Sequence, residues 1–284
     1  MQSTTPQHIF ETTVQSVAWN INKTGILTPI VHINANGNIT TKTVTGYNAK
    51  WVQDKHIAKG AKIAIELSKG ITPVIAKTIY PASDKEEAQL WESVCLCPYC
   101  GHPTIWDSTL TELRCDNSEC SGAQLARLGF FFKTVGATSI NKNALTLLYN
   151  DGYRNVKDFL YATFEDLSYV YKLTNNRINL ILDATQKIKA GVEVTKLMYA
   201  SCCFDGIGQT KAQKALLQLP KESLFAFYNG NLHTWANNDE LRQQKFFTKA
   251  NTDTKSFMLG IIPFYNFVAT NRLKILPLNT QKQA

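Results

Sequence analysis

The sequence predicts a multidomain protein in which a small all-β barrel is followed by a four-cysteine zinc finger and then by an all-α region. Three observations predict this order. Strand-like alternation fills residues 14–79, two close pairs of cysteines follow, and helical periodicity dominates from Ala123 onward. A length of 284 residues fits two or three small domains, and an apolar content of 44% is enough for packed cores. The predicted boundaries are 1–12 for an N-terminal arm, 13–80 for the barrel, 81–94 for a connector, 95–122 for the zinc finger, 123–275 for the helical domain and 276–284 for a tail.

The barrel is predicted from short strand-like stretches separated by turn residues. Residues 37–46 and 62–67 alternate apolar β-branched side chains with polar ones, and Asn34-Ala-Asn-Gly37 is a good hairpin turn. About five short strands in this span suit a small closed barrel of the OB type. Residues 1–12 are expected to form a flexible or docking arm, and residues 81–94 a charged connector with a short helix.

Four cysteines with paired spacing predict a metal centre: Cys97, Cys100, Cys115 and Cys120. The pairs read C-P-Y-C and C-D-N-S-E-C, with 14 residues between them. Tight turns of this kind hold tetrahedral zinc, and four thiolates leave no coordination position for chemistry, so the zinc is expected to be structural. Cys95 is an alternative first ligand, but the C-P-x-C-G turn, in which Gly101 can take a positive φ, favours Cys97.

Composition excludes several classes of protein. The chain opens with polar, uncharged residues rather than a signal peptide, and seven cysteines are too few for a secreted disulfide scaffold, so we expect a reducing, cytoplasmic compartment. The longest apolar stretch, residues 257–269, is broken by Gly260 and Pro263, so no membrane span is expected. A formal net charge of +8 favours polyanionic partners.

The helical region contains a glycine-rich turn that opens a helix. Two glycines flank an apolar residue in D-G-I-G-Q-T-K-A, so the backbone can turn tightly while the apolar residue plugs the turn into the core. The next helix then presents its amide groups to an anion, and a lysine adds charge. This arrangement is typical of helix-hairpin-helix motifs that bind a DNA phosphate without reading bases. The predicted contact residues are Gly206, Ile207, Gly208, Gln209, Thr210 and Lys211.

Three weaker copies of this turn are candidates for further hairpins. Residues 172–178 have a similar pattern, with Asn175 or Asn176 where glycine is expected, and asparagine tolerates a left-handed φ better than most residues. Residues 138–144 and 249–256 are the other two candidates. Each of them is as consistent with a purely structural turn as with a DNA contact.

Several stretches match one protein family in order and in detail. Residues 22–31 read N-K-T-G-I-L-T-P-I-V, residues 44–48 read V-T-G-Y-N, and residues 114–124 read R-C-D-N-S-E-C-S-G-A-Q. They resemble the G-R-T-G-x-x-T-P-V-A, A-T-L-H-N and R-C-x-N-x-x-C-x-A-Q motifs in the C-terminal half of bacterial NAD-dependent DNA ligases. The last motif has one extra residue here. The resemblance covers roughly residues 12–272.

The resemblance implies a DNA-binding role without catalysis. The family's nucleophilic lysine lies in a K-x-D-G motif, and no lysine of this sequence does. The chain is therefore expected to be a separate subunit that lacks the adenylation domain and grips nicked double-stranded DNA for an adenylating partner. NAD+ and Mg2+ would act through that partner. The resemblance implies a DNA-contacting barrel face at Lys23, Thr24, Gly25, Lys42 and Asn48.

Two other readings stay open. The chain could be a stand-alone, non-catalytic DNA-binding accessory protein of replication or repair. It could also be a zinc-ribbon and barrel protein that binds other proteins and does not touch DNA.

Overall fold

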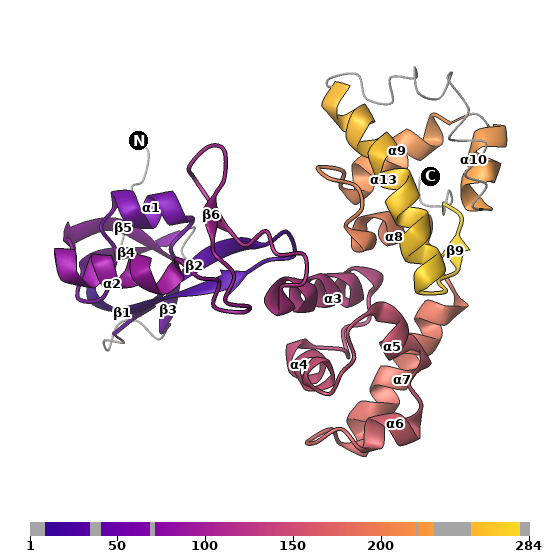
Figure 1. Cartoon of the computed structure of the whole chain (residues 1–284), viewed down its shortest axis with the longest axis horizontal. Helices are drawn as coiled ribbons and strands as arrows, with labels where there is room; N and C mark the ends of the chain where they lie inside the picture. The colour runs from indigo at the N-terminus through magenta and orange to yellow at the C-terminus, as the bar shows by residue number, and fades with distance from the viewer. Residues whose placement is uncertain (1–8, 35–40, 69–71, 220, 230–250, 279–284) are drawn as a thin grey trace, which may run out of the picture. The chain divides into compact units, whose positions relative to one another are not determined.

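The computed structural model describes residues 9–34, 41–68, 72–219, 221–229 and 251–278. It divides into two compact units, Met1–Ala126 and Arg127–Ala284, and each is described by itself (Figure 1). The first unit combines an antiparallel β sheet with a four-cysteine cluster, and the second is helical.

The sheet of the first unit is built on five antiparallel strands: β1 (Phe10–Ile21), β2 (Ile26–Ile33), β3 (Thr43–Thr45), β4 (Lys62–Ser68) and β5 (Thr72–Tyr80). The hydrogen-bonded order is β5-β4-β1-β2-β3. The N-terminal part of β1 pairs with β4 and the remainder pairs with β2, with a bulge between Val14 and Ser16. A bulge bends a strand, so the two parts of β1 can pair with different neighbours in a curved sheet. Strand β3 also lies beside β5, so the sheet curls toward closure.

The start of β1 differs from the expected domain boundary. Phe10 pairs with Ile65 and Thr12 with Ile63, so residues 10–12 belong to the sheet rather than to the arm. Val14 is buried in the same core, which explains why the strand extends this far. The predicted hairpin turn at Asn34–Gly37 lies mostly outside the described residues, although β2 and β3 on either side of it pair antiparallel as expected.

Two helices cover this sheet. Helix α1 (Ala49–Asp54) lies between β3 and β4 and buries Val52 in the core of the sheet. Helix α2 (Asp84–Val94) occupies the predicted charged connector and begins after the N-cap Ser83. Its Leu90 and Trp91 pack against both the core of the sheet and the core around the cysteines, so α2 bridges the two.

The cysteine-rich segment extends the same sheet. Strands β6 (Ile105–Trp106) and β7 (Leu113–Arg114) form a hairpin, and β7 pairs with β2. Trp19 of β1 and Leu27 of β2 share a buried core with Leu113 and the cysteines. The five-stranded sheet and the cysteine segment are therefore one packing unit.

The second unit is a helical array entered through α3 (Ser121–Val135). Its other described helices are α4 (Lys142–Asn150), α5 (Val156–Tyr161), α6 (Phe164–Ser168), α7 (Asn175–Ala190), α8 (Val194–Ser201), α9 (Gln209–Leu217), α10 (Lys221–Tyr228) and α13 (Asn251–Thr270). The helical periodicity predicted from Ala123 onward is confirmed in this unit, for example by the amphipathic stretches that form α4, α7 and α9.

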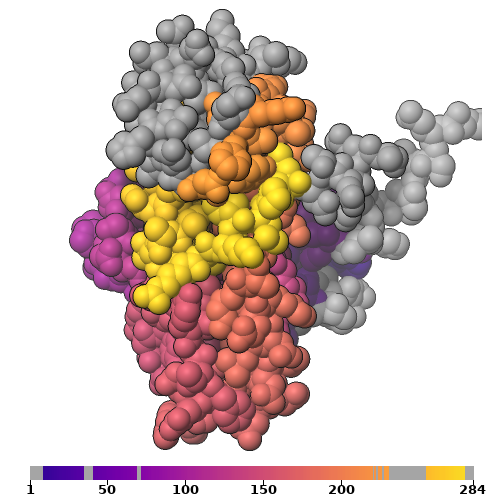
Figure 2. Space-filling view, turned by 90° about the vertical axis from the view of Figure 1, so that its right-hand side faces the viewer, coloured from indigo at the N-terminus to yellow at the C-terminus, as the bar shows by residue number. Residues whose placement is uncertain are grey.

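Helix α13 closes the helical unit. Phe267 contacts Phe131 of α3 at 5.7 Å between ring centroids, and the Asn271 amide oxygen accepts a hydrogen bond from the Lys157 backbone amide at 2.9 Å. Strand β9 (Ile275–Leu276) then pairs in parallel with β8 (Val192–Glu193), which follows α7. The yellow α13–β9 segment lies directly against the salmon α7 segment in Figure 2.

Candidate metal centre and candidate nucleic-acid interface

The four predicted cysteines come together in one cluster. The Sγ atoms of Cys97, Cys100, Cys115 and Cys120 all lie within 4.8 Å of one another. The Cys97–Cys120 sulfur distance is 3.8 Å and the Cys100–Cys115 distance is 3.5 Å. A tetrahedral ion with Zn–S bonds of about 2.3 Å places sulfurs about 3.8 Å apart. The donor set and its spacing therefore fit a zinc ion.

Backbone hydrogen bonds shape both cysteine turns. The Gly101 amide donates to the Cys97 carbonyl at 2.9 Å, and Gly101 adopts a φ of +70°, as its place in the C-P-x-C-G turn predicted. On the other side, the Cys120 amide donates to the Asn117 carbonyl at 3.1 Å. These hydrogen bonds hold the two turns from which the four thiols converge.

Cys95, the alternative ligand, lies outside the cluster. Its side chain is exposed, and its thiol donates to the Glu92 carbonyl at the end of α2 at 2.9 Å. Cys97, by contrast, is buried with Cys115 and Cys120, and the half-buried Cys100 completes the cluster. The geometry selects Cys97 as the first member of the cluster.

The electrostatics of the cluster favour a cation. Burial raises the pKa of the Cys115 thiol to about 12 and also raises the pKa of Cys97. At Cys100 burial is outweighed by hydrogen bonds from the backbone of His102 and the side chain of Asn117, which lower its pKa to about 7. Four neighbouring thiolates repel one another, and a cation between them removes that penalty.

Gly25, in the turn between β1 and β2, joins the sheet to the cysteine cluster. The Cys115 amide donates to the Gly25 carbonyl at 2.9 Å, and Gly25 has a φ of +85°. A Cβ at Gly25 would stand 2.3 Å from the Cys115 carbonyl oxygen, so no larger residue fits. Gly25 therefore has a structural role at this joint, and its contact with DNA stays a prediction of the sequence.

The other DNA-contact residues predicted in this unit lie in three separate places. Lys23 and Thr24 occupy the β1–β2 turn, which Asn22 organises by accepting hydrogen bonds from the Thr24 amide, the Thr24 hydroxyl and the Ile26 amide. Lys42 is exposed just before β3. Asn48 caps α1, since its side-chain oxygen accepts the Trp51 amide at 2.7 Å. The sequence already contained this pattern, because an asparagine is a favoured N-cap residue and can accept the backbone amide three residues later.

Three hairpin turns in the helical unit share one geometry. In each, the amide of an apolar residue donates to the carbonyl of a buried residue three positions earlier, and the helix N-cap follows directly. The turns are residues 137–141 before α4, 170–174 before α7 and 204–208 before α9. The three hydrogen bonds measure 3.0, 3.1 and 3.3 Å. The helical unit thus repeats a helix–turn–helix element three times among the described residues.

The second turn is aligned differently from the sequence prediction. Lys172 has a φ of +65° and matches Gly206, whose φ is +69°. Asn175 and Asn176, where glycine was expected, lie inside α7. For the candidate at 249–256, the described part begins at Asn251 and is helical, in α13.

The three turns differ in how their helix N-termini are satisfied. Asn141 caps α4 by accepting the Ala144 amide at 3.0 Å, and Thr174 caps α7 by accepting the Arg177 amide at 3.4 Å. Gly208 offers no side-chain hydrogen bond to α9. Since a side-chain cap occupies amides that an anion would need, only the third of these turns keeps that end of its helix open.

The third turn has the predicted features around this open end. Ile207 is buried, whereas Gly206, Gln209 and Thr210 are exposed. The exposed Lys211 folds back so that its Nζ donates to the Gly206 carbonyl at 3.3 Å. A lysine ammonium and the first amides of α9 therefore lie on the same tip.

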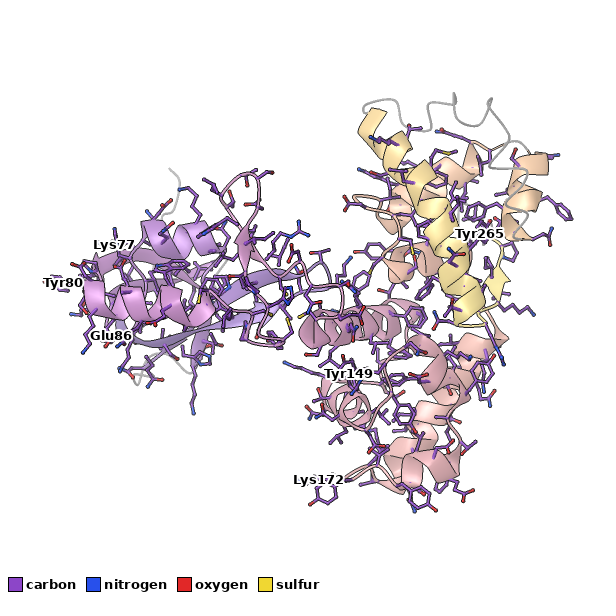
Figure 3. All side chains as sticks on the ribbon, in the orientation of Figure 1. Lys77, Tyr80, Glu86, Tyr149, Lys172 and Tyr265 are labelled. Carbon is purple, nitrogen blue, oxygen red and sulfur yellow. The ribbon has the colours of Figure 1, made fainter. Side chains whose placement is uncertain are left out.

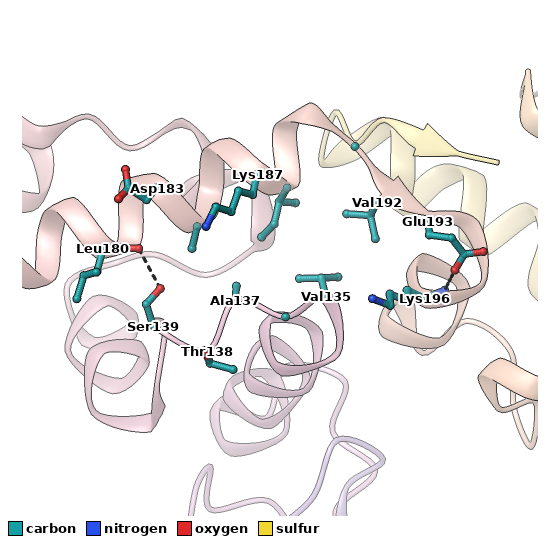
Figure 4. A pocket seen from close by; sticks show the side chains of 14 residues that line it. Val135, Ala137, Thr138, Ser139, Leu180, Asp183, Lys187, Val192, Glu193 and Lys196 are labelled. Carbon is teal, nitrogen blue, oxygen red and sulfur yellow. Dashed lines mark hydrogen bonds between the residues drawn. The ribbon is translucent and has the colours of Figure 1, made fainter. Parts of the chain in front are cut away.

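A cavity of about 440 Å3 lies beside the first turn (Figure 4). Lys187 of α7 and Lys196 of α8 reach toward the loop from opposite sides, and Asp183 and Glu193 also line the cavity. The Ser139 hydroxyl donates to the Leu180 carbonyl at 2.9 Å, which braces the first turn against α7. With two cationic and two anionic side chains, the cavity has no formal excess of either charge.

None of the helices in the described part of the chain combines the length and apolar character needed to cross a membrane.

Comparison with known proteins relates the chain to DNA ligases. No protein-family model matches it. A protein named DNA ligase from Acanthamoeba polyphaga mimivirus is 24% identical over 210 residues, which is 72% of this chain and 31% of the relative. Proteins of the same name from Fusobacterium nucleatum subsp. nucleatum and Acinetobacter baylyi are 26% identical over 168 residues and 24% identical over 216 residues. These matches cover 58% and 73% of this chain, and 22% and 32% of the relatives. The chain spans between 22% and 32% of the length of these three relatives, and it is a homologue of proteins named DNA ligase.

Proposed function

We propose that this chain is the DNA-binding subunit of an NAD-dependent DNA ligase and grips nicked duplex DNA while an adenylating partner seals the nick. The relatives named DNA ligase support a role in ligation. The fold described above supports a binding role, because it offers a sheet, a metal cluster and repeated hairpin turns in the order that the motifs predicted.

The five-stranded sheet supports an OB-type barrel. Its hydrogen-bonded order β5-β4-β1-β2-β3, the bent β1 and the helix between β3 and β4 are what this architecture needs. Lys23 and Thr24 on the β1–β2 turn and Lys42 beside β3 are the side chains that we assign to DNA. Asn48 and Gly25 shape the barrel and support these contacts indirectly.

The basic charge lies in the helical unit. Residues 127–284 contain 20 lysines and arginines against 11 aspartates and glutamates, a formal net charge of +9. Residues 1–126 contain 10 against 11, a net charge of −1. Phosphate binding rests mainly on such cations and is independent of sequence, which suits a protein that must act at any nick.

The open N-terminus of α9 is the single observation that carries the proposal. Gly206 and Gly208 contribute no side chains of their own to the turn, and the N-cap Gly208 makes no side-chain hydrogen bond to the helix. Lys211 adds a positive charge at the tip. A DNA phosphate is the ligand that these groups fit. The first two turns, which are capped by Asn141 and Thr174, then hold the unit together.

The cysteine cluster is proposed to hold a structural zinc ion. The four sulfurs would complete its tetrahedral shell, so the ion would stiffen the joint at Gly25 and Cys115 and take no part in chemistry.

Adenylation is assigned to the partner. Ligation needs a lysine nucleophile that takes up AMP, and this sequence has no K-x-D-G motif to supply it. NAD+ and Mg2+ would bind to that partner, and this chain would contribute the grip on DNA.

The proposal is tested by equilibrium binding of the full chain to fluorescent nicked duplexes of two unrelated sequences at several salt concentrations. We expect equal affinities for the two sequences and a steep loss of affinity with salt. The logarithm of the binding constant should fall against the logarithm of the salt concentration with a slope of about −0.9 for each phosphate contacted. The absence of binding at low salt would contradict the proposal and would favour the protein-binding alternative.

A further inference from the structure

The second hairpin turn carries the two most exposed tyrosines among the described residues. Tyr169 is 78% exposed and Tyr171 is 77% exposed, and they flank Val170, which is buried in the unit. Lys172 follows, and Figure 3 shows it at the tip of the loop that joins α6 to α7. Its Nζ lies 5.1 Å from the Tyr171 ring centroid.

This tip is held in the same geometry as the proposed phosphate-binding turn but cannot bind a phosphate in the same way. Lys172 matches Gly206 in φ, and the same backbone hydrogen bond closes both turns. Thr174, however, occupies an amide at the N-terminus of α7 with its own side chain. The second turn therefore presents aromatic and cationic side chains where the third presents backbone amides.

The charge around the tip fits a polyanion. The tip carries the cation Lys172, and residues 167–182 contain no acidic residue. Arg177 lies further along, where its guanidinium donates to the Ser139 carbonyl at 3.2 Å. The nearest acidic residues in sequence before the tip, Glu165 and Asp166, lie in the first turn of α6, and Asp166 is engaged by Thr163. Exposed aromatic rings beside cationic side chains are the usual platform for unpaired bases, because every base has a face that can stack.

We propose that Tyr169 and Tyr171 stack on unpaired bases, so that the chain binds DNA with a short single-stranded gap more tightly than DNA with a simple nick. Lys172 approaches the Tyr171 ring and offers a cation to the adjoining phosphate, and the exposed ring surface receives the base. Paired bases in an intact duplex expose only their edges, so they offer no face to these rings. The inference rests on the proposed DNA-binding function and adds a second class of bound DNA to it, because a gap, unlike a nick, leaves no adjoining ends for the partner to seal.

The test measures the affinity of the full chain for a nicked duplex, for a duplex with a gap of a few nucleotides and for a single strand of the same length. Wild-type protein should prefer the gapped duplex. The Tyr169→Ala/Tyr171→Ala double variant should lose about tenfold in affinity for the gapped duplex and less than about twofold for the nicked one. The Tyr169→Phe/Tyr171→Phe variant should keep the wild-type affinities, because stacking needs the ring and not the hydroxyl.

Phe225→Ala is the matched control, since Phe225 is an aromatic residue of the same unit that is 71% exposed. This variant should bind all three DNAs as the wild type does. The inference is overturned if the double alanine variant binds the gapped duplex normally, if its losses are equal for gapped and nicked DNA, or if Phe225→Ala loses as much. Wild-type protein that binds none of the DNAs would instead contradict the proposed function itself.

Discussion

The backbone of Cys115 is fastened to the backbone of Gly25. The Cys115 amide donates to the Gly25 carbonyl at 2.9 Å, and a Cβ on Gly25 would stand 2.3 Å from the Cys115 carbonyl oxygen. A cysteine of the metal cluster is thereby tied to the turn between β1 and β2. The sheet and the cluster therefore stabilise each other.

Substituting Gly25 should damage this joint. Gly25→Ala should lower the free energy of unfolding by about 3 kcal/mol or more, because it combines a strained φ with a clash against Cys115. Gly60→Ala is the control, since Gly60 has a φ of +86° with nothing within 4 Å of its would-be Cβ. That control should cost only about 1–2 kcal/mol. Urea denaturation of the first unit measures both, and equal losses would show that the contact with Cys115 contributes nothing.

Removing one clustered thiol should abolish metal binding. Cys97→Ser should release zinc and destabilise the first unit, because the tetrahedral shell is lost. Cys95→Ser should keep the metal, since Cys95 bonds to Glu92 outside the cluster. Zinc content after gel filtration, measured by atomic absorption, checks both variants. Retention of zinc by Cys97→Ser, or its loss from Cys95→Ser, would show that the ligand set is wrong.

Capping the third hairpin should change stability and DNA binding in opposite directions. Gly208 has a φ of −79° and open space around it, so Gly208→Asn is accommodated and should cap α9 as Asn141 caps α4. We expect a gain of a few tenths of a kcal/mol in stability and a several-fold loss of affinity for nicked DNA. Gln218→Asn, at the other end of α9, should leave binding unchanged. If the capped variant binds DNA normally, the phosphate does not bind at the N-terminus of α9.

The start of α6 should become less stable in acid. The backbone amide and the hydroxyl of Thr163 donate to Asp166 at 2.8 and 2.7 Å and hold the pKa of its carboxyl below the usual value. This stabilisation is fully present above the ordinary pKa of about 3.9 and is lost as the pH falls through the lower pKa of the folded state. The stability difference between wild type and Asp166→Asn should therefore shrink below about pH 4. A difference that stays constant with pH would contradict this assignment.

Local patterns predicted much of the architecture. The cysteine spacing identified all four members of the cluster, and the G-I-G pattern predicted a tight turn with an apolar residue in the core, where Ile207 is buried. Helical periodicity predicted the helical character of the chain from Ala123 onward. These features depend on residues close together in sequence, which is why the sequence alone was sufficient.

Contacts between residues far apart in the sequence could not be predicted from local patterns. Gly25 and Cys115 come together only after β2 and β7 pair, so the residues next to either of them in sequence do not predict the contact. The second hairpin was misaligned because its left-handed residue is Lys172, and lysine gives no sequence cue for a positive φ. Trp91 packs against two cores only because of the position that α2 takes in the fold, and the helix sequence does not show that position.

Reconstituted nick sealing tests the central claim most directly. A polypeptide with the K-x-D-G lysine would be preloaded with AMP and given nicked duplex DNA, alone and with this chain. We predict that this chain alone seals nothing, that the adenylated polypeptide alone seals slowly, and that the pair seals much faster at moderate salt. Gly208→Asn should reduce that acceleration and leave the AMP loading of the partner unchanged. Equal sealing rates with and without this chain would contradict the account.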